Sequence, residues 1–304
     1  MIQSVTITNY LGDTMTMRLM SPDDSGVLIK SITGLGPVEA EISTSDYAVS
    51  DGVYFNSARS GSRNIVFDIY YLFKPTIEEA RHRVYAMFPV KRMVKMVFKT
   101  DTRTVYATGY VETHEPDIFN KLSGVQISII CPDPYFYSEA SDRTMFSGVD
   151  DLFEFPFENN STTEKLIEIG NIFADTIKNI YYEGDSEVGM TIRVHALTDV
   201  TFITLYNLDT REQMLIDLTK LGEDLSSKMI ALDDLIIVTS QGQKSLTLVR
   251  EGTPHNALNC LDRSSTWLTL HKGDNAFAYI INGGIESDDD VIFEIENFVA
   301  YEGV

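Results

Sequence analysis

The sequence has few of the residues that usually form metal or redox sites. Its 304 residues include only two cysteines and five histidines. None of these histidines stands at a metal-ligand spacing from another histidine or a cysteine, so no metal and no cofactor is expected. Two cysteines are also too few for a disulfide framework, and we expect Cys131 and Cys260 to be free thiols.

Long apolar runs and catalytic motifs are also missing. No segment approaches the apolar length of a membrane-spanning helix, and the start MIQSVTITNY lacks the basic and apolar regions of a signal peptide, so no membrane insertion is expected. There is no P-loop, GxGxxG or GxSxG motif. Glu294 and Glu296 are spaced like paired glycosidase carboxylates, but two solvent-facing positions of an amphipathic strand have the same spacing. The sequence therefore predicts no enzyme.

Positive charge is scarce, and its distribution is uneven. The formal net charge is −21. Residues 1–140 contain 13 Lys and Arg against 16 Asp and Glu, whereas the remaining residues contain 11 against 29. A nucleic-acid or anionic-membrane binder needs positive charge against phosphate, so this balance argues against both.

Period-two alternation predicts a chain that is mainly strand. In the first part, residues 4–9 and 125–129 show the pattern. Residues 63–73 form a long apolar run rich in β-branched and aromatic residues, and two further strands are expected around residues 92–99 and 103–112. One helix is predicted from Thr76, because Glu79 three residues later completes a capping box and Pro89 would end the helix. After residue 138 many short strands follow with turn residues between them, and this pattern predicts a β-sandwich.

The stretch CPDPYFYS, residues 131–138, predicts a domain boundary. Pro132 and Pro134 donate no backbone hydrogen bond and hold their neighbours extended. The connector is therefore expected to be stiff, with Tyr135, Phe136 and Tyr137 packed against another surface. We predict one domain over residues 1–138 and a second over residues 139–304.

Two segments of the first part are candidates for contact with another molecule. One is a glycine-rich, aromatic segment, residues 42–63, whose DG and SGS breaks suggest an exposed arm; its candidate contact residues are Tyr47, Tyr54, Phe55, Arg59 and Arg63. The other is a basic stretch without acidic residues, residues 91–99, in which Lys91, Arg92 and Lys95 are the candidates and Lys99 is a further cation. A solvated face explains the basic stretch comparably well.

Longer pieces of both parts resemble one protein family. In the first part they are GLGPVEAEISTSDYAVSDGVYFNSARSGSRNIV, FPVKRMVKMVF and GYVETHEPDIFNKLSGVQISIICPDPYFYS. In the second part they are YYEGDSEVGMTIRVHA, LYNLDTREQMLIDL, IVTSQGQKSL and WLTLHKGDNAFAYIINGG. Together they resemble, in order, the distal tail proteins of long-tailed bacteriophages and related phage-tail-like particles.

The resemblance implies a fold and an assembly. The first domain would be a tail-tube-like β-barrel or split barrel with one helix, and the second a galectin-like β-sandwich. The first domains would form a ring, of six copies in the family, between the tail-tube protein and the tail-tip or baseplate hub proteins. DNA would only pass through its channel. The protein would lie at the distal end of the virion tail, after assembly in the bacterial cytoplasm, and the connector aromatics would pack at the domain seam.

Alternatives remain open at this stage. The leading hypothesis is a structural ring-forming adaptor, whose arm either reaches a neighbouring subunit or folds back on its own domain. The rival hypothesis is a saccharide-binding module that contacts the bacterial cell wall through the sandwich, with Trp267 as a stacking platform. A core or rim role for Trp267 is the simpler interpretation.

Overall fold

The computed structural model describes residues 1–21, 25–72, 76–117, 119, 123–151, 170–174, 177–240, 242–282 and 291–304. They form two compact units, Met1–Ala140 with Ala300–Val304, and Ser141–Val299. The chain crosses between the units twice, because its last five residues belong to the first unit. The sequence-based boundary, which assigned residues 139–304 to one domain, did not anticipate this return.

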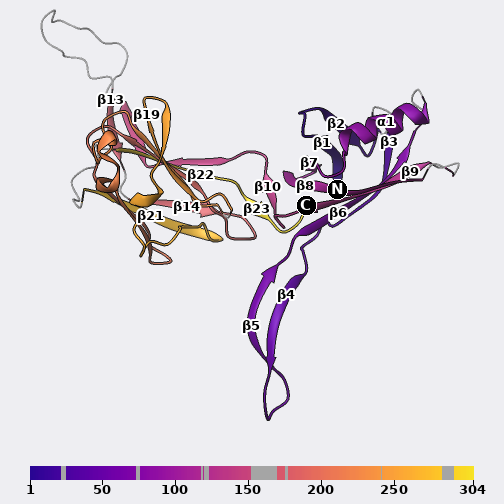
Figure 1. Ribbon diagram of the computed structural model, residues 1–304, viewed down its shortest axis with the longest axis horizontal. Coiled ribbons are helices and arrows are strands. Elements are labelled where there is room, and N and C mark those ends of the chain that lie inside the picture. The colour runs from indigo at the N-terminus through magenta and orange to yellow at the C-terminus, as the bar shows by residue number, and fades with distance from the viewer. Residues whose placement is uncertain are drawn as a thin grey trace, which may run out of the picture. The chain divides into compact units, whose positions relative to one another are not determined.

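The first unit is built on one antiparallel sheet with an α-helix against it (Figure 1). The strands run in the order β2-β1-β7-β8-β9-β6-β3, and β10 pairs with both β8 and β23. The bounds are β1 Ile2–Thr8, β2 Thr14–Arg18, β3 Val27–Thr33, β6 Arg63–Tyr71, α1 Ile77–Met87, β7 Met93–Thr100, β8 Thr104–Asp117, β9 Gly124–Cys131, β10 Phe136–Ser138 and β23 Ala300–Tyr301.

The core of the first unit lies between the sheet and α1. On β6, every second residue from Ile65 to Tyr71 is buried, because successive side chains of a strand point to opposite faces of the sheet. Ala80, Val84 and Met87 form the buried face of α1 and belong to the same apolar cluster. The predicted helix start is confirmed, since Thr76 is the N-cap and its side chain accepts a hydrogen bond from the Glu79 N–H.

Strands β4 (Ala40–Asp46) and β5 (Val53–Ser60) form a separate two-stranded sheet. Figure 1 shows this hairpin extending from the end of β6, clear of the first unit's main sheet. We call residues 40–60 the arm. Every residue of its two strands is exposed, so the arm does not fold back onto its own domain.

The second unit consists mainly of two antiparallel sheets. One has the order β11-β22-β15-β18-β19-β20, the other β14-β21-β16-β17, and β12 pairs separately with β13. Aromatic side chains join the larger sheets: Tyr279 of β21 stacks on Phe293 of β22 with ring centroids 5.1 Å apart, and Phe146 packs edge-on against both. This is the sandwich-type core expected from the alternation.

The bounds in the second unit are β11 Asp142–Met145, β12 Ser147–Asp151, β13 Gly170–Ala174, β14 Ile177–Tyr182, β15 Thr191–Ala196, β16 Phe202–Asn207, β17 Glu212–Asp217, β18 Asp234–Val238, β19 Ser245–Arg250, β20 Thr253–Asn256, β21 Gly273–Ile281 and β22 Val291–Asn297. Short 3-10 helices span Leu218–Lys220, Glu223–Leu225 and Leu258–Cys260. Mainly β structure with a single α-helix in the described ranges confirms the predicted fold class. None of the described helices has the length and apolar character needed to cross a membrane.

Candidate assembly interface

The arm has two chemically different faces, because residues directly opposite each other in an antiparallel pair share a face. Ile42 opposes Ala58, and Asp46 opposes Val53. Between these pairs the register shifts, so that Thr44 opposes Phe55 and Asn56 is the extra residue of a bulge. One face of the arm is therefore mostly apolar along its length, with Ile42, Val53 and Phe55 as its large side chains.

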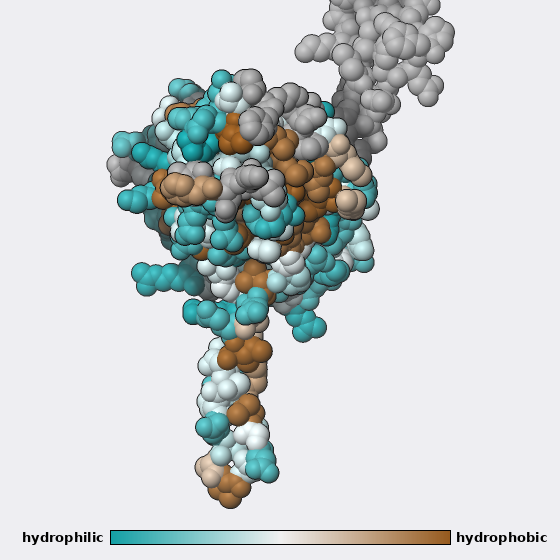
Figure 2. Space-filling model, turned by 90° about the vertical axis from the view of Figure 1, so that its right-hand side faces the viewer, coloured by the Kyte–Doolittle hydropathy of each residue, from teal (hydrophilic) through white to brown (hydrophobic). Residues whose placement is uncertain are grey.

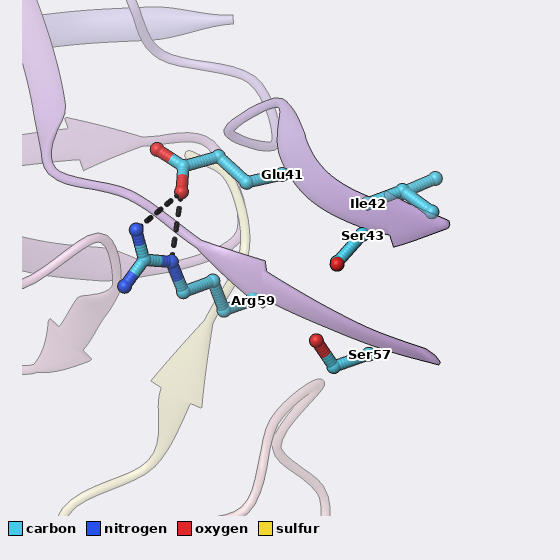
Figure 3. Close-up of a pocket in the computed structure, with 5 residues that line it drawn as sticks. All are labelled: Glu41, Ile42, Ser43, Ser57 and Arg59. Atoms are coloured by element: carbon cyan, nitrogen blue, oxygen red, sulfur yellow. Dashed lines mark hydrogen bonds and ion pairs between the residues drawn. The ribbon is translucent and has the colours of Figure 1, made fainter. Parts of the chain in front are cut away.

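The other face of the arm is polar. Glu41 accepts hydrogen bonds from Arg59, and Ser43 lies opposite Ser57, as Figure 3 shows. These residues, with Ile42, line a shallow hollow. Both ionic side chains are mostly exposed, so their pair contributes little to stability. Tyr54 lies on this face as well.

The large side chains of the arm are unusually exposed for their type. Ile42 is 62% exposed, Tyr54 60% and Phe55 59%. In Figure 2 the arm, at the bottom of the view, carries apolar residues in brown between white and teal ones. A row of exposed apolar side chains on a projecting ribbon makes the arm a candidate surface for contact with another molecule.

Arg63 differs from the sequence-based expectation. It was placed with the arm as an interface residue, but it begins β6 and is only 2% exposed. Its guanidinium donates to backbone carbonyls inside the first unit, and burial lowers its pKa. A side chain buried in this way cannot contact a neighbouring subunit, so Arg63 is not an interface residue.

The basic stretch lies at the beginning of β7 and along one face of it. Lys91 and Arg92 are exposed in the turn after α1, and the Arg92 guanidinium lies 5.1 Å from the Tyr10 ring centroid. Lys95 lies on the outward face of β7, with its ammonium 4.3 Å from the centroid of Tyr106. Since β7 pairs with β1 and β8 on its two sides, the stretch lies on a sheet face rather than an edge.

The connector aromatics serve the first unit itself. Phe136 is fully buried and packs edge-on against Phe98 at 5.6 Å. Asp133, between Pro132 and Pro134, accepts hydrogen bonds from the Tyr135 N–H and the Tyr137 hydroxyl. These hydrogen bonds lie within the connector. Tyr137 is also the β-ladder partner of Tyr106 in β8. The expected packing of these aromatics at a domain seam stays a prediction.

Trp267 and Glu296 each have a cationic neighbour within the second unit. The Lys244 ammonium lies 5.7 Å from the Trp267 ring centroid, and the ring is half-buried. Glu296 accepts hydrogen bonds from Ser141 and Arg143, and Arg193 adds a third contact. Glu296 is thus held in an ion-pair network across three neighbouring strands. Glu294 lies 3.7 Å from Arg143, and its buried Oε1 has no hydrogen-bond partner among the described residues. A saccharide-binding role for Trp267 stays a prediction.

The two thiols and the remaining titratable groups give no sign of a metal centre. Cys131 and Cys260 are both free and buried, and burial raises the pKa of each to about 11. Within the part of the chain that the structure describes, no three His, Cys, Asp or Glu side chains gather to hold a metal ion.

Sequence reasoning missed the return of the chain to the first unit. Ala300 is fully buried there, and β23 pairs with β10 through Phe136↔Tyr301 and Tyr137↔Ala300. The available signal was the apolar run FVAY at residues 298–301, directly after a strand. We had assigned this run to the sandwich because nothing in a local pattern identifies a partner strand that is far away in the sequence.

Comparisons with known proteins give matches among solved structures. No protein-family model matches the chain, and no curated protein matches it. The crystal structure of the SPP1 Dit (gp 19.1) protein, described as a paradigm of the hub adsorption apparatus in phages that infect Gram-positive bacteria, aligns with a TM-score of 0.63. The alignment covers 97% of this chain and 98% of that chain, at 12% sequence identity.

Two structures of the phage P2 baseplate in its activated conformation align less closely. The structure with Ca gives a TM-score of 0.45 at 11% identity and covers 98% of both chains. The structure with Sr gives 0.46 at 12% identity and covers 97% of both chains. This chain shares the fold of the Dit protein over nearly its whole length.

Proposed function

We propose that this protein is a structural hub at the distal end of a phage-like tail, without catalytic activity. The observation that carries the proposal is the likeness to the SPP1 Dit protein over 97% of the chain. In this proposal copies of the chain form a ring, of six subunits, that joins the tail-tube protein to the tail-tip or baseplate proteins. DNA passes through the ring, and the protein lies in the virion tail after assembly in the host cytoplasm.

The arm supports an assembly role on physical grounds. A two-stranded ribbon by itself is marginally stable in water, and this one turns large apolar side chains toward solvent. Contact with a neighbour would bury Ile42, Val53 and Phe55 together, because they share one face. We propose that this apolar face of the arm packs on the adjacent subunit of the ring.

A ring also requires a second, different surface, because its contacts are heterologous. The outward face of β7 is the second candidate. Lys91, Lys95 and Lys99 form no ion pair with any residue in the described ranges. In a strongly acidic protein these cations would favour an acidic neighbour, and a copy of the same chain supplies one.

The test is the assembly state of the full chain. We expect closed rings by negative-stain electron microscopy and a multiple of 34.2 kDa by light scattering at high protein concentration. Phe55→Ser should lower the association constant by roughly tenfold or more, since it removes a large apolar contact from each interface. Ring disassembly is followed by light scattering on dilution.

The matched control is Tyr181→Ser. Tyr181 is also an exposed strand aromatic, 74% exposed, but it lies in the second unit. The control should assemble like the unaltered chain. A chain that stays monomeric at high concentration, and also in the presence of tail-tube and tail-tip proteins, would overturn the proposed function.

A further inference from the structure

Arg63 is a buried cation whose hydrogen bonds all go to backbone carbonyls. Its Nε donates to Pro134 at 2.6 Å, its Nη1 to Gly34 at 2.6 Å and to Gly36 at 2.5 Å, and its Nη2 to Glu302 at 2.7 Å. The guanidinium carbon also lies 4.3 Å from the Phe136 ring centroid. Hydrogen bonds from a charged donor are stronger than neutral ones, so each of these carbonyls is firmly held.

The four carbonyls come from three segments that are far apart in the sequence. Gly34 and Gly36 precede the arm and form its base, Pro134 belongs to the connector, and Glu302 belongs to the returning segment. One side chain therefore fixes the base of the arm and both crossings between the units. Loosening one segment leaves a donor of a buried cation unsatisfied, which disfavours local opening of that segment alone.

The returning segment, residues 300–304, begins as the short strand β23 and bends at Glu302. It pairs with β10, and the Val304 N–H donates to the Leu35 carbonyl at 3.1 Å, within the base of the arm. Arg103 donates to the Gly303 carbonyl at 3.1 Å, and its guanidinium lies 4.4 Å from the Tyr301 ring centroid. The segment is therefore held through its main chain, by β10 at Ala300–Tyr301 and by Leu35, Arg63 and Arg103 after the bend. Main-chain hydrogen bonds also supply the affinity when a peptide adds to the edge of a sheet.

We propose that the first unit contains an acceptor site for a short peptide, that residues 300–304 are its ligand, and that its occupancy holds the base of the arm. Arg63 is the positioning residue that couples the two, because its Nη1 contacts the base while its Nη2 contacts the ligand. The consequence for ring assembly rests on the proposed function, whereas the coupling within one chain does not.

The first experiment vacates the site and refills it. A chain that ends at Val299 should bind a fluorescent peptide of residues 298–304, and a scrambled peptide should not compete. Hydrogen exchange of residues 33–42 should be at least roughly tenfold faster in the shortened chain and should slow again when the peptide is added. Absence of peptide binding by a folded shortened chain, or unchanged exchange at the arm base, would overturn the inference.

A second variant keeps the test valid if the shortened chain does not fold. Arg103→Met in the full chain removes the donor to Gly303 and the contact with Tyr301 without altering Arg63. Exchange should rise in residues 300–304 and, through the coupling, in residues 33–42. The control, Arg59→Met, removes an exposed ion pair on the arm itself and should leave residues 300–304 unchanged.

Ring formation separates this inference from the proposed function. If the unaltered chain forms no rings but exchange at the two segments is coupled, the proposed function fails and the inference stands. If the unaltered chain forms rings and loosening residues 300–304 leaves exchange at residues 33–42 unchanged, the inference fails alone.

Discussion

At the scale of single residues, two glycines two positions apart make different demands on their surroundings. Gly34 has φ +82, and a Cβ there would lie 2.0 Å from the Asn64 carbonyl oxygen. Gly36 has nothing within 4 Å of its Cβ position. The carbonyls of both glycines accept hydrogen bonds from Arg63. Substituting each glycine in turn therefore measures the cost of backbone strain and crowding at Gly34 while the hydrogen bonds to Arg63 are of the same kind in both.

We therefore expect Gly34→Ala to lower the free energy of unfolding by about 1–3 kcal/mol, because alanine is strained at this φ and the added methyl group clashes. Gly36→Ala is the control and should change it by less than about 0.5 kcal/mol. Urea denaturation of both variants measures the difference. Equal effects of the two substitutions would contradict the explanation.

Glu296 makes the stability of the second unit depend on pH. Its pKa lies below the ordinary value of 4.5, chiefly because the Ser141 hydroxyl donates to the carboxylate, with Arg143 and Arg193 adding to the effect. A lowered folded-state pKa contributes stability that is present above pH 4.5 and is lost as the pH falls through the folded pKa.

Glu296→Gln should therefore destabilise the second unit at pH 7 and reduce the loss of stability on acidification below pH 4.5. Thermal melts between pH 7 and pH 3 give the comparison. Ser141→Ala removes the hydrogen bond that contributes most to the lowered pKa of Glu296. It should also reduce the loss of stability on acidification, but by less than Glu296→Gln does. A variant whose acid dependence matches that of the unaltered chain would show that Glu296 is not responsible.

At the scale of the element, the arm adds exposed surface without adding to the core. All residues of β4 and β5 are exposed, and Glu41 lies directly opposite Arg59. Replacing residues 42–58 with Asn-Gly would join Glu41 to Arg59 and close the shortened hairpin with a tight turn. We expect the free energy of unfolding to change by less than about 1 kcal/mol, and the rings to be lost.

Urea denaturation and light scattering test the two halves of this prediction. A loss of several kcal/mol would mean that the arm packs on its own domain. Rings that persist without the arm would mean that the subunits join through another surface.

The elements themselves were largely predictable, because their signals are local. Thr76 and Glu79 indicated where α1 begins, the apolar run of residues 63–73 indicated β6, and alternation indicated β9. The DG and SGS breaks also identified the arm as exposed. Arg63 was misplaced because charge and proximity to the arm suggested the surface, whereas its burial depends on carbonyls brought in by Pro134 and Glu302. No local pattern contains that information.

At the scale of the whole molecule, the second unit is inserted into the first. Tyr137 pairs with Ala300, so only residues 138–140 would separate the two strands if Ala140 were joined to Ala300. Hairpin loops of about two to five residues are common, and a Gly-Gly bridge would give a loop of five. The first unit should then fold alone as residues 1–140 bridged to residues 300–304.

The comparison is a chain that ends at residue 140. It lacks β23 and leaves Arg63 without its Glu302 acceptor, so we expect a free energy of unfolding lower by roughly 2 kcal/mol or more. Circular dichroism during urea denaturation measures both chains. Equal stability would show that residues 300–304 contribute nothing to the first unit.

The insertion also has a consequence for folding kinetics. The hydrogen bond from Arg63 to Glu302 joins residues 239 positions apart, and closing so long an unstructured loop is slow. Within the second unit, however, Asp142 pairs with Asn297, beside the two crossings. Once the second unit has folded, residues 300–304 emerge next to residues 138–140, and the long loop becomes a short one. We therefore expect the sandwich to refold first and the first unit to close around Arg63 afterwards, so that the base of the arm becomes fixed last.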